Sequence, residues 1–467
     1  MPRVARNGDK GIKGVIAIDP ELRSHDNRSD EPQTAIAGDF YLCRKHSAPP
    51  GGHIRLKNGC QFYKIDGKPV AMQYATKATC SCRIIEGSGV HHCCPHLDDK
   101  AKRLAEREML IEQARDAAEA GAAAGVTPEE AALLNRRADA LERLNRDVRF
   151  AEMSAAVYQS ADAPPSLTKG FGNAPEGMIR LTDPEFRDML PGALSDKGIV
   201  WNDDKSGFHA DVYYDELHGS YTVAYRGTDI NRPDIVTDID QAHGLETTQY
   251  NEAMKIGDAI KVTVADKRYA GIDLQTTGHS LGGGESAAAG TVGGVPYISW
   301  NAAGLHPKTL SRYTEGKLTN ADAAPLGVAY NTDYDPLTAA QTKEGSQRIY
   351  KAVPAIGKGV EIAGSPFMSL KPFALAAGRL IQGFADWSRS QTGGQLPPTP
   401  AATRHELPTY TRDPEAGLHR RLDGEKAWKA GHSILTVLDS IEAEKGGHES
   451  ALRRLLARAG ARKGAGR

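Results

Sequence analysis

The chain has 467 residues, of which 40% are hydrophobic and 25% are charged, and its formal net charge is −1. A length of this order suits two to three domains of about 150 residues each. The near-neutral charge gives no support for a nucleic-acid partner, and the absence of any run of about 18 apolar residues argues against a transmembrane helix.

The N-terminal region, residues 1–97, is rich in Gly, Cys and His and contains short β-like runs such as HIRLKN and CQFYKI. Its first residues, MPRVARNGDKGIKG, lack the apolar centre of a signal peptide, so we expect any export to use another route. All six cysteines lie between Cys43 and Cys94. A disulfide-bonded secreted enzyme would distribute its cysteines along the chain, so this clustering favours a local thiol or metal site.

Several motifs of this region resemble those of the PAAR-repeat proteins. The resemblance rests on the Gly-Asp pairs at 8–9 and 38–39, the C-x-x-H motif of Cys43 and His46, and the run DGKPVA at 66–71. It implies a small β-rich cone that sits on the trimeric VgrG-type spike of the bacterial type VI secretion machine.

The same resemblance implies a structural zinc near the tip of the cone, held by His and Cys side chains, which suit tetrahedral zinc. Cys43, His46, Cys80 and Cys82 are the candidate ligands. The sequence departs from the family because GIKGV lacks the usual early histidine and HHCCPH at 91–96 is additional. Reduced cysteines without a metal are the alternative interpretation.

Residues 98–150 form two charged, Ala/Leu-rich stretches separated by GVTPEE. Thr127 can cap the second stretch as a helix, and Pro128 can occupy its first helical position. The pattern predicts a helical hairpin or linker. It leaves open whether this hairpin contacts a partner or is simply solvated.

Residues 151–445 alternate β-like runs with helical segments. Four runs end in polar loops: GSYTVAYRGT, GIDLQTTGHS, GVPYISWNAAG and PLGVAYNTDYDPLT. Helical stretches such as YNEAMKIGDAIKVTVADK lie between them, and this alternation predicts an α/β domain with a largely parallel sheet. The tail at 446–467 is basic and is expected to be a solvated helix end.

The run GHSLG at 278–282 matches G-x-S-x-G, with Ser280 at its centre. A nucleophile elbow requires small residues two positions before and after the serine, because the turn from strand to helix is tight. A β-like run precedes this motif, and small, helix-compatible residues follow it. We therefore predict that Ser280 is a nucleophile rather than part of an ordinary glycine-rich turn.

A serine nucleophile needs an orienting carboxylate and a base, which follow it along the chain in that order in such a fold. The candidates for the acid lie at a strand end, in AYNTDYDPLT. Asp335 is preferred because Pro336 after it starts a loop, and Asp333 is the reserve.

His432 is the preferred base, because it opens the helical run GHSILTVLDSIE near the expected carboxyl edge of the sheet. His306 precedes the acid and breaks the expected chain order. His405 and His419 lie in Pro/Arg-rich segments that are expected to be irregular.

The oxyanion hole needs two backbone N–H donors. Leu281, directly after the serine, should supply one of them. Thr228, at the end of the run TVAYRGTD, should supply the second N–H and, through its hydroxyl, a further hydrogen bond.

The motifs VAYRGT, GHSLGG, TDYDPL and a late GHS together resemble the class 3 lipases, the fungal triacylglycerol-lipase-like branch of the α/β-hydrolases. The resemblance covers about residues 150–440 and assigns the same four roles, with Thr228 at the oxyanion hole and Ser280, Asp335 and His432 as the triad. The sequence departs from the family in the roughly 95 residues between acid and histidine, a longer interval than expected.

That long interval contains Phe373, Leu380, Phe384 and Trp387 on one helical stripe, within 366–387. Packed core is one interpretation of the stripe. The other is a lid or a helix that docks on a bilayer.

The two resemblances imply an antibacterial type VI secretion effector, made in the cytoplasm and delivered to a competitor's membrane, where it hydrolyses phospholipid esters. A cognate immunity protein is then expected, and the triad needs no metal or cofactor. Two alternatives stay open: a carboxylesterase or thioesterase acting on soluble substrates, and a spike-tip adaptor without catalysis.

Overall fold

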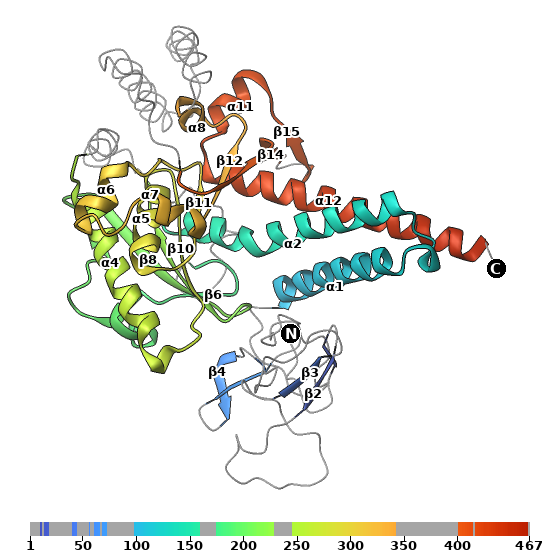
Figure 1. Ribbon diagram of the computed structural model, residues 1–467, viewed down its shortest axis with the longest axis horizontal. Helices are drawn as coiled ribbons and strands as arrows, with labels where there is room; N and C mark the ends of the chain where they lie inside the picture. The colour runs from blue at the N-terminus through green and yellow to red at the C-terminus, as the bar shows by residue number, and fades with distance from the viewer. Residues whose placement is uncertain are drawn as a thin grey trace.

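The computed structural model in Figure 1 describes residues 10–11, 14–17, 40–43, 56, 60–65, 68–71, 98–158, 174–227, 245–341, 400–413 and 416–465. In the N-terminal region the described strands are antiparallel. They form a sheet of β1 (Lys10–Gly11), β2 (Gly14–Ala17) and β3 (Phe40–Cys43), and a hairpin of β4 (Cys60–Ile65) and β5 (Lys68–Val70). These strands agree with a β-rich region, whereas the cone implied by the PAAR resemblance stays a prediction.

Within the described ranges, the second part of the chain is built around an eight-stranded sheet with the order β13-β12-β11-β10-β9-β8-β6, in which β7 (Asn202–Asp203) pairs with β8. The parallel strands are β9 (Ser220–Tyr225), β10 (Leu274–His279), β11 (Tyr297–Trp300), β12 (Gly327–Thr332) and β13 (Thr403–Leu407). The antiparallel strands are β6 (Met178–Arg180) and β8 (Phe208–Asp215). The predicted α/β fold and its four predicted runs, which form β9 to β12, are confirmed.

Helices cover both faces of this sheet (Figure 1). On one face lie α2 (Pro128–Ala156) and the start of α12 (Ile434–Ala465). Phe150 of α2 and Val437 of α12 pack with Trp300 of β11. On the other face lie α4 (Thr248–Ala265) and α5 (Leu281–Gly293), and Ile256 packs with Val223 of β9. The result is the three-layer architecture of an α/β-hydrolase-like domain, with its core on both sides of the sheet.

The helical hairpin before the sheet forms as predicted. It consists of α1 (Asp98–Ala120), the 3-10 turn η3 (Gly121–Ala124) and α2. Thr127 and Glu130 form a reciprocal capping box, in which each side chain accepts from the other residue's backbone N–H, and Pro128 follows the cap. These interactions fix the start of α2 because they satisfy backbone donors that the helix leaves unpaired.

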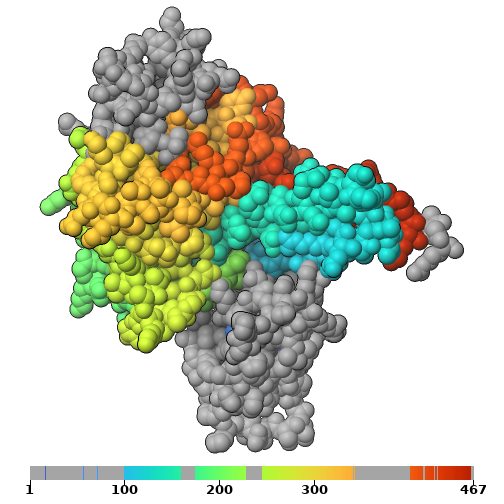
Figure 2. All heavy atoms as spheres, in the orientation of Figure 1, coloured from blue at the N-terminus to red at the C-terminus, as the bar shows by residue number. Residues whose placement is uncertain are grey.

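The C-terminal tail differs from the prediction of a solvated helix end. Residues 446–465 continue α12 without a break, and Leu452, Leu455 and Ala459 are buried against α1 and α2. These helices project from the body as an arm (Figure 2). Apolar residues recur every three or four positions in this part of α12 and form a buried stripe between the basic residues. This stripe explains why the tail packs against α1 and α2.

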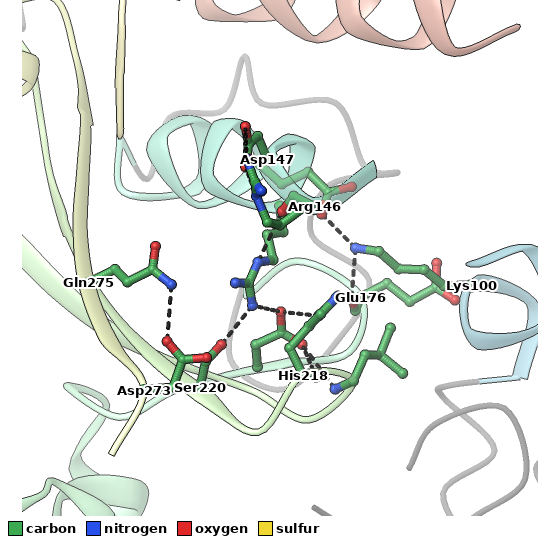
Figure 3. A network of polar contacts seen from close by, with 12 residues as sticks. Lys100, Arg146, Asp147, Glu176, His218, Ser220, Asp273 and Gln275 are labelled. Carbon is green, nitrogen blue, oxygen red and sulfur yellow. Dashed lines mark hydrogen bonds and ion pairs between the residues drawn. The ribbon is translucent and has the colours of Figure 1, made fainter. Parts of the chain in front are cut away.

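The domain boundary expected at 150–151 falls inside α2. The last turns of this helix lie under the sheet, and Arg149 Nη1 contacts Asp215 Oδ2 at 3.0 Å and Ser220 Oγ at 2.6 Å. Lys100 of α1 adds an ion pair to Glu152 of α2 and a hydrogen bond of 3.0 Å to the carbonyl of Glu176 (Figure 3). The hairpin is therefore joined to the sheet by buried and partly buried polar contacts as well as by apolar packing.

Two segments expected to be irregular are strands. His405 lies in β13 and His419 lies in β15 (His419–Arg421), which pairs with β14 (Tyr410–Arg412). Because β13 is an edge strand, charged side chains can point away from the core, which weakens the sequence pattern of a strand.

The remaining described helices are short: α6 (Pro307–Tyr313), α7 (Asn320–Ala323), α8 (Pro336–Ala340) and α11 (Gly424–Ala430). None of the described helices is long and apolar enough to span a membrane. The stripe at 366–387 lies outside the described residues.

Candidate active site

Ser280 stands between the end of β10 and the start of α5, the position predicted for a nucleophile elbow. Its backbone has φ 58° and ψ −125°, a combination that a residue with a side chain rarely adopts. Although Ser280 is the N-cap of α5, its side chain makes no capping hydrogen bond. The turn therefore leaves the hydroxyl available for another partner.

The two glycines of the motif are required by backbone contacts. A β-carbon on Gly278 would stand 2.1 Å from the carbonyl oxygen of Gly282, and one on Gly282 would stand 2.3 Å from the carbonyl oxygen of Tyr225. Both distances are shorter than any normal van der Waals contact. The steric reason given for the motif is thus present on both sides of Ser280.

His432 lies in the turn between α11 and α12 and reaches Ser280 across 152 positions of sequence. Its Nε2 is 2.9 Å from Ser280 Oγ, and its Nδ1 is 2.7 Å from Asp335 Oδ1. Since a carboxylate can only accept, Nδ1 carries the proton in this pair and Nε2 can accept the hydrogen of the serine. The three side chains form one directed series of hydrogen bonds.

Asp335 is held by the start of the short helix that follows it. One oxygen accepts from the backbone N–H of Leu337 at 3.3 Å and the other from that of Thr338 at 2.8 Å. The side chain is fully buried. These contacts leave Oδ1 facing His432 and fix its direction.

Asp333, the reserve candidate, has different partners. Its Oδ1 accepts from the backbone N–H of Thr409 at 3.0 Å and from the Thr409 hydroxyl at 2.6 Å, while Oδ2 pairs with Arg421. The geometry therefore favours Asp335 over Asp333 as the partner of His432.

The helix start at Ser280 also offers an anion site. Leu281 is the first residue of α5, so its N–H lacks an acceptor within the helix and lies at the positive end of the helix dipole. Gly227, at the end of the run after β9, comes close to the elbow, since a β-carbon there would stand 3.1 Å from Ser280 Cβ. Thr228, the second predicted donor, lies outside the described residues.

Sequence reasoning missed His279, Asn301 and Thr332, which hold the turn of His432, and Tyr158, which contacts His279. The carbonyl of His432 accepts from His279 Nε2 at 2.6 Å, and the carbonyl of Gly431 accepts from Asn301 Nδ2 at 2.8 Å. The other ring nitrogen of His279, Nδ1, lies 2.8 Å from the hydroxyl of Tyr158. One signal was available in the sequence. His279 is the last residue of a strand, and side chains alternate between the two faces of a strand, so its ring is directed into the protein and away from solvent.

His279 is buried in the protein. Burial, together with the neighbouring His432, lowers its pKa to about 3. The imidazole is therefore neutral around neutral pH, and it can donate from one nitrogen while it accepts at the other.

The predicted metal site cannot be built from the described part of the chain. Cys43 ends β3, but His46, Cys80 and Cys82 lie outside the described residues. In the ranges that the structure does cover, no three His, Cys, Asp or Glu side chains gather as a metal site.

Two comparisons with known proteins bear on this geometry. Residues 149–383 match the family model of a Tle-like phospholipase domain. The chain is also 32% identical over 174 residues to a protein named extracellular phospholipase A1 from Serratia liquefaciens; the match covers 36% of this chain and 50% of that protein. The chain thus spans about half the length of this curated relative. The family match includes the positions of Ser280 and Asp335 and ends before His432.

Proposed function

Because this chain belongs to the Tle-like phospholipase family and carries a phospholipase-type hydrolase domain, we propose that it is a phospholipase of the A type, which hydrolyses carboxylic ester bonds of phospholipids. The observation that carries the proposal is the hydrogen-bonded series from Ser280 through His432 to Asp335. The relative named phospholipase A1 supports the same substrate class.

In the proposed reaction, Ser280 Oγ attacks the ester carbonyl carbon while His432 Nε2 takes the serine proton. The carbonyl oxygen becomes an oxyanion. The backbone N–H groups of Leu281 and Thr228, with the Thr228 hydroxyl, would donate hydrogen bonds to it. His432 then gives its proton to the leaving lysophospholipid oxygen, and an acyl-enzyme remains. A water molecule, deprotonated by His432, releases the fatty acid and restores Ser280.

Asp335 has a positioning and electrostatic part in this scheme. Its carboxylate keeps the Nδ1 proton of His432 in place, so that Nε2 is the nitrogen that faces the serine. It also stabilises the imidazolium that exists while His432 holds the extra proton.

We further propose that the enzyme is an antibacterial type VI secretion effector, on the strength of the PAAR-like motifs in residues 1–97. Its partners would be a VgrG-type trimeric spike and a cognate immunity protein, and its target would be a competitor's membrane lipid. A structural zinc in the N-terminal region belongs to the same proposal. Metal analysis of the wild type beside Cys43→Ser tests it, and an equal zinc content would contradict Cys43 as a ligand.

Mass spectrometry of phospholipid products from the wild type and from Ser280→Ala tests the hydrolase proposal. We expect free fatty acid and lysophospholipid from the wild type and neither from the variant. Phosphatidic acid as the product would contradict cleavage of the carboxylic ester. Hydrolysis of short soluble esters without any action on phospholipid would instead support a carboxylesterase.

A further inference from the structure

The turn that carries His432 is held through two consecutive backbone carbonyls. The carbonyl of Gly431 accepts from Asn301 Nδ2 at 2.8 Å and from the Thr332 hydroxyl, and the carbonyl of His432 accepts from His279 Nε2 at 2.6 Å. The donors come from the ends of three adjacent parallel strands, β11, β12 and β10. The position of His432 is therefore set by the sheet and not only by its own contact with Asp335.

Chemistry fixes the direction of the hydrogen bonds around His279. A carbonyl oxygen can only accept, so Nε2 of His279 carries the proton. In a neutral imidazole the other nitrogen is then an acceptor, and the Tyr158 hydroxyl, 2.8 Å away, donates to it. A series of two hydrogen bonds thus runs from the Tyr158 hydroxyl through His279 to the backbone carbonyl of His432.

We propose that Tyr158 and His279 are positioning residues for His432: the tyrosine hydroxyl donates to Nδ1 of His279 and orients its ring, and the Nε2–H of that ring holds the backbone of the base. This inference rests on the proposed hydrolase function. Neither residue needs to touch the substrate, because both act through the turn that carries His432.

The reason lies in what happens without the hydroxyl. In Tyr158→Phe the His279 Nδ1 would be a buried acceptor without its donor, and the ring would turn toward another donor and draw its Nε2–H away from the carbonyl of His432. The turn must then shift, and with it the ring that faces Ser280. Misplacement of a catalytic group by about 1 Å can lower a rate by about 100-fold.

The position of Tyr158 connects the helical hairpin to the turn that carries His432. Tyr158 follows α2 by two residues, and the same helix end contacts β10 through Ser154 Oγ, 3.1 Å from Thr277 Oγ1. The helix that links the arm to the sheet thus supplies the first donor of the series.

The test is a double-mutant cycle with Tyr158→Phe and His279→Gln, assayed on a soluble ester. Glutamine lacks the imidazole Nδ1 to which Tyr158 donates, and its side-chain amide can donate from near the position of the histidine Nε2. We expect Tyr158→Phe to lower kcat about 10- to 100-fold with little change in KM in the wild-type background. In the His279→Gln background the same change should cost less than about threefold, since the imidazole that the hydroxyl orients is absent.

Tyr297→Phe is the matched control. Its side chain is buried and its hydroxyl donates to a backbone carbonyl, that of Ala401, but Tyr297 begins β11 and so lies at the opposite end of the parallel strands from Ser280. We expect kcat to stay within about threefold of the wild type. Thermal unfolding of all variants checks that they are folded at the assay temperature.

Nitrogen-15 NMR of histidine-labelled protein gives a readout that does not depend on activity. We expect His279 to carry its proton on Nε2 in the wild type, and we expect the chemical shift of its Nδ1 to change in Tyr158→Phe because the donor to that nitrogen is lost. An unchanged Nδ1 shift, or equal losses of kcat in both backgrounds, would overturn the inference. A wild type that hydrolyses no ester would contradict the proposed function instead, and the nitrogen-15 measurement would still decide whether Tyr158 donates to His279.

Discussion

The two aspartates after β12 allow a matched comparison at the level of single residues. Asp335→Asn should lower kcat by about 10⁴-fold: the backbone N–H of Thr338 holds the amide oxygen, so the amide nitrogen faces His432 Nδ1, donates to it and favours the wrong tautomer. Asp333→Asn should change kcat by only a few fold, since its partners are Thr409 and Arg421. Steady-state kinetics on a soluble ester measures both, and equal losses would contradict Asp335 as the acid.

His279 should also leave a trace in the dependence of stability on pH. Its pKa is about 3 in the folded chain and about 6.5 in an unfolded one, so between these values the unfolded chain binds a proton that the folded chain does not. The free energy of unfolding must therefore decrease as the pH falls through this window. His279→Gln removes this contribution.

Urea unfolding at pH 4, 5, 6 and 8 measures this effect. The decline toward acid should be shallower in His279→Gln than in the wild type, by up to about 1.4 kcal/mol per pH unit. Other titrating groups are common to both proteins and cancel in the difference. Parallel curves would show that His279 titrates as it does in the unfolded chain.

The close approach of Ser280, Asp335 and His432 was predictable because the chemistry proposed for them constrains the local sequence and the chain order. The elbow needs glycines at fixed positions, and the acid and base must follow it. Tyr158 and His279 were not predictable, since their roles depend on a contact between the end of α2 and the turn before α12. No local pattern marks a side chain that acts on another residue's backbone.

At the level of whole elements, α12 differs most from its prediction. Leu452→Ala should lower the free energy of unfolding by about 2–5 kcal/mol, because the side chain is fully buried among Leu110, Leu134 and Leu455. Arg454→Ala, two positions away and exposed, should change it by at most about 0.5 kcal/mol. Urea denaturation measures both, and equal small effects would support the solvated tail that the sequence predicted.

The apolar spacing of Leu452, Leu455 and Ala459 was visible in the sequence, but the partner of that stripe was not. It packs on α1 and α2, which lie about 300 positions earlier in the chain. The six basic residues of the tail, 446–467, favoured a solvated interpretation. By contrast, the start of α2 was predictable to the residue, because a capping box and a proline act within one turn.

At the level of the whole molecule, the arm and the hydrolase domain share structure that a boundary at 150–151 would divide. The last turns of α2 place Leu144, Val148 and Phe150 in the core beneath the sheet. Arg149 forms an ion pair with the buried Asp215. His218, which also contacts Asp215, and Ser220, which contacts Arg149, are labelled in Figure 3. Burial alone would raise the pKa of Asp215, but His218 and Arg149 outweigh it and hold that pKa well below its ordinary value.

A chain that begins at residue 151 should therefore lose the hydrolase activity, whereas one that begins at residue 98 should keep it. Removal of residues 98–150 exposes the apolar face of the sheet and leaves Asp215 buried without Arg149, and the loss of a partner from a buried ion pair alone costs about 3–5 kcal/mol. The candidate triad and the Tyr158 series lie within the described residues after position 98, so the longer chain keeps every side chain of both.

Hydrolysis of a soluble ester and thermal unfolding compare the two truncated chains with the full one. Equal activity of the chains that begin at residues 98 and 151 would mean that α2 up to residue 150 only links the domains and is not needed for hydrolysis. Loss of activity in both would place a requirement within residues 1–97. The expected outcome, activity only from residue 98 onward, would make α2 part of the catalytic domain, because the same helix closes the core beneath the sheet and supplies the chain that leads to Tyr158.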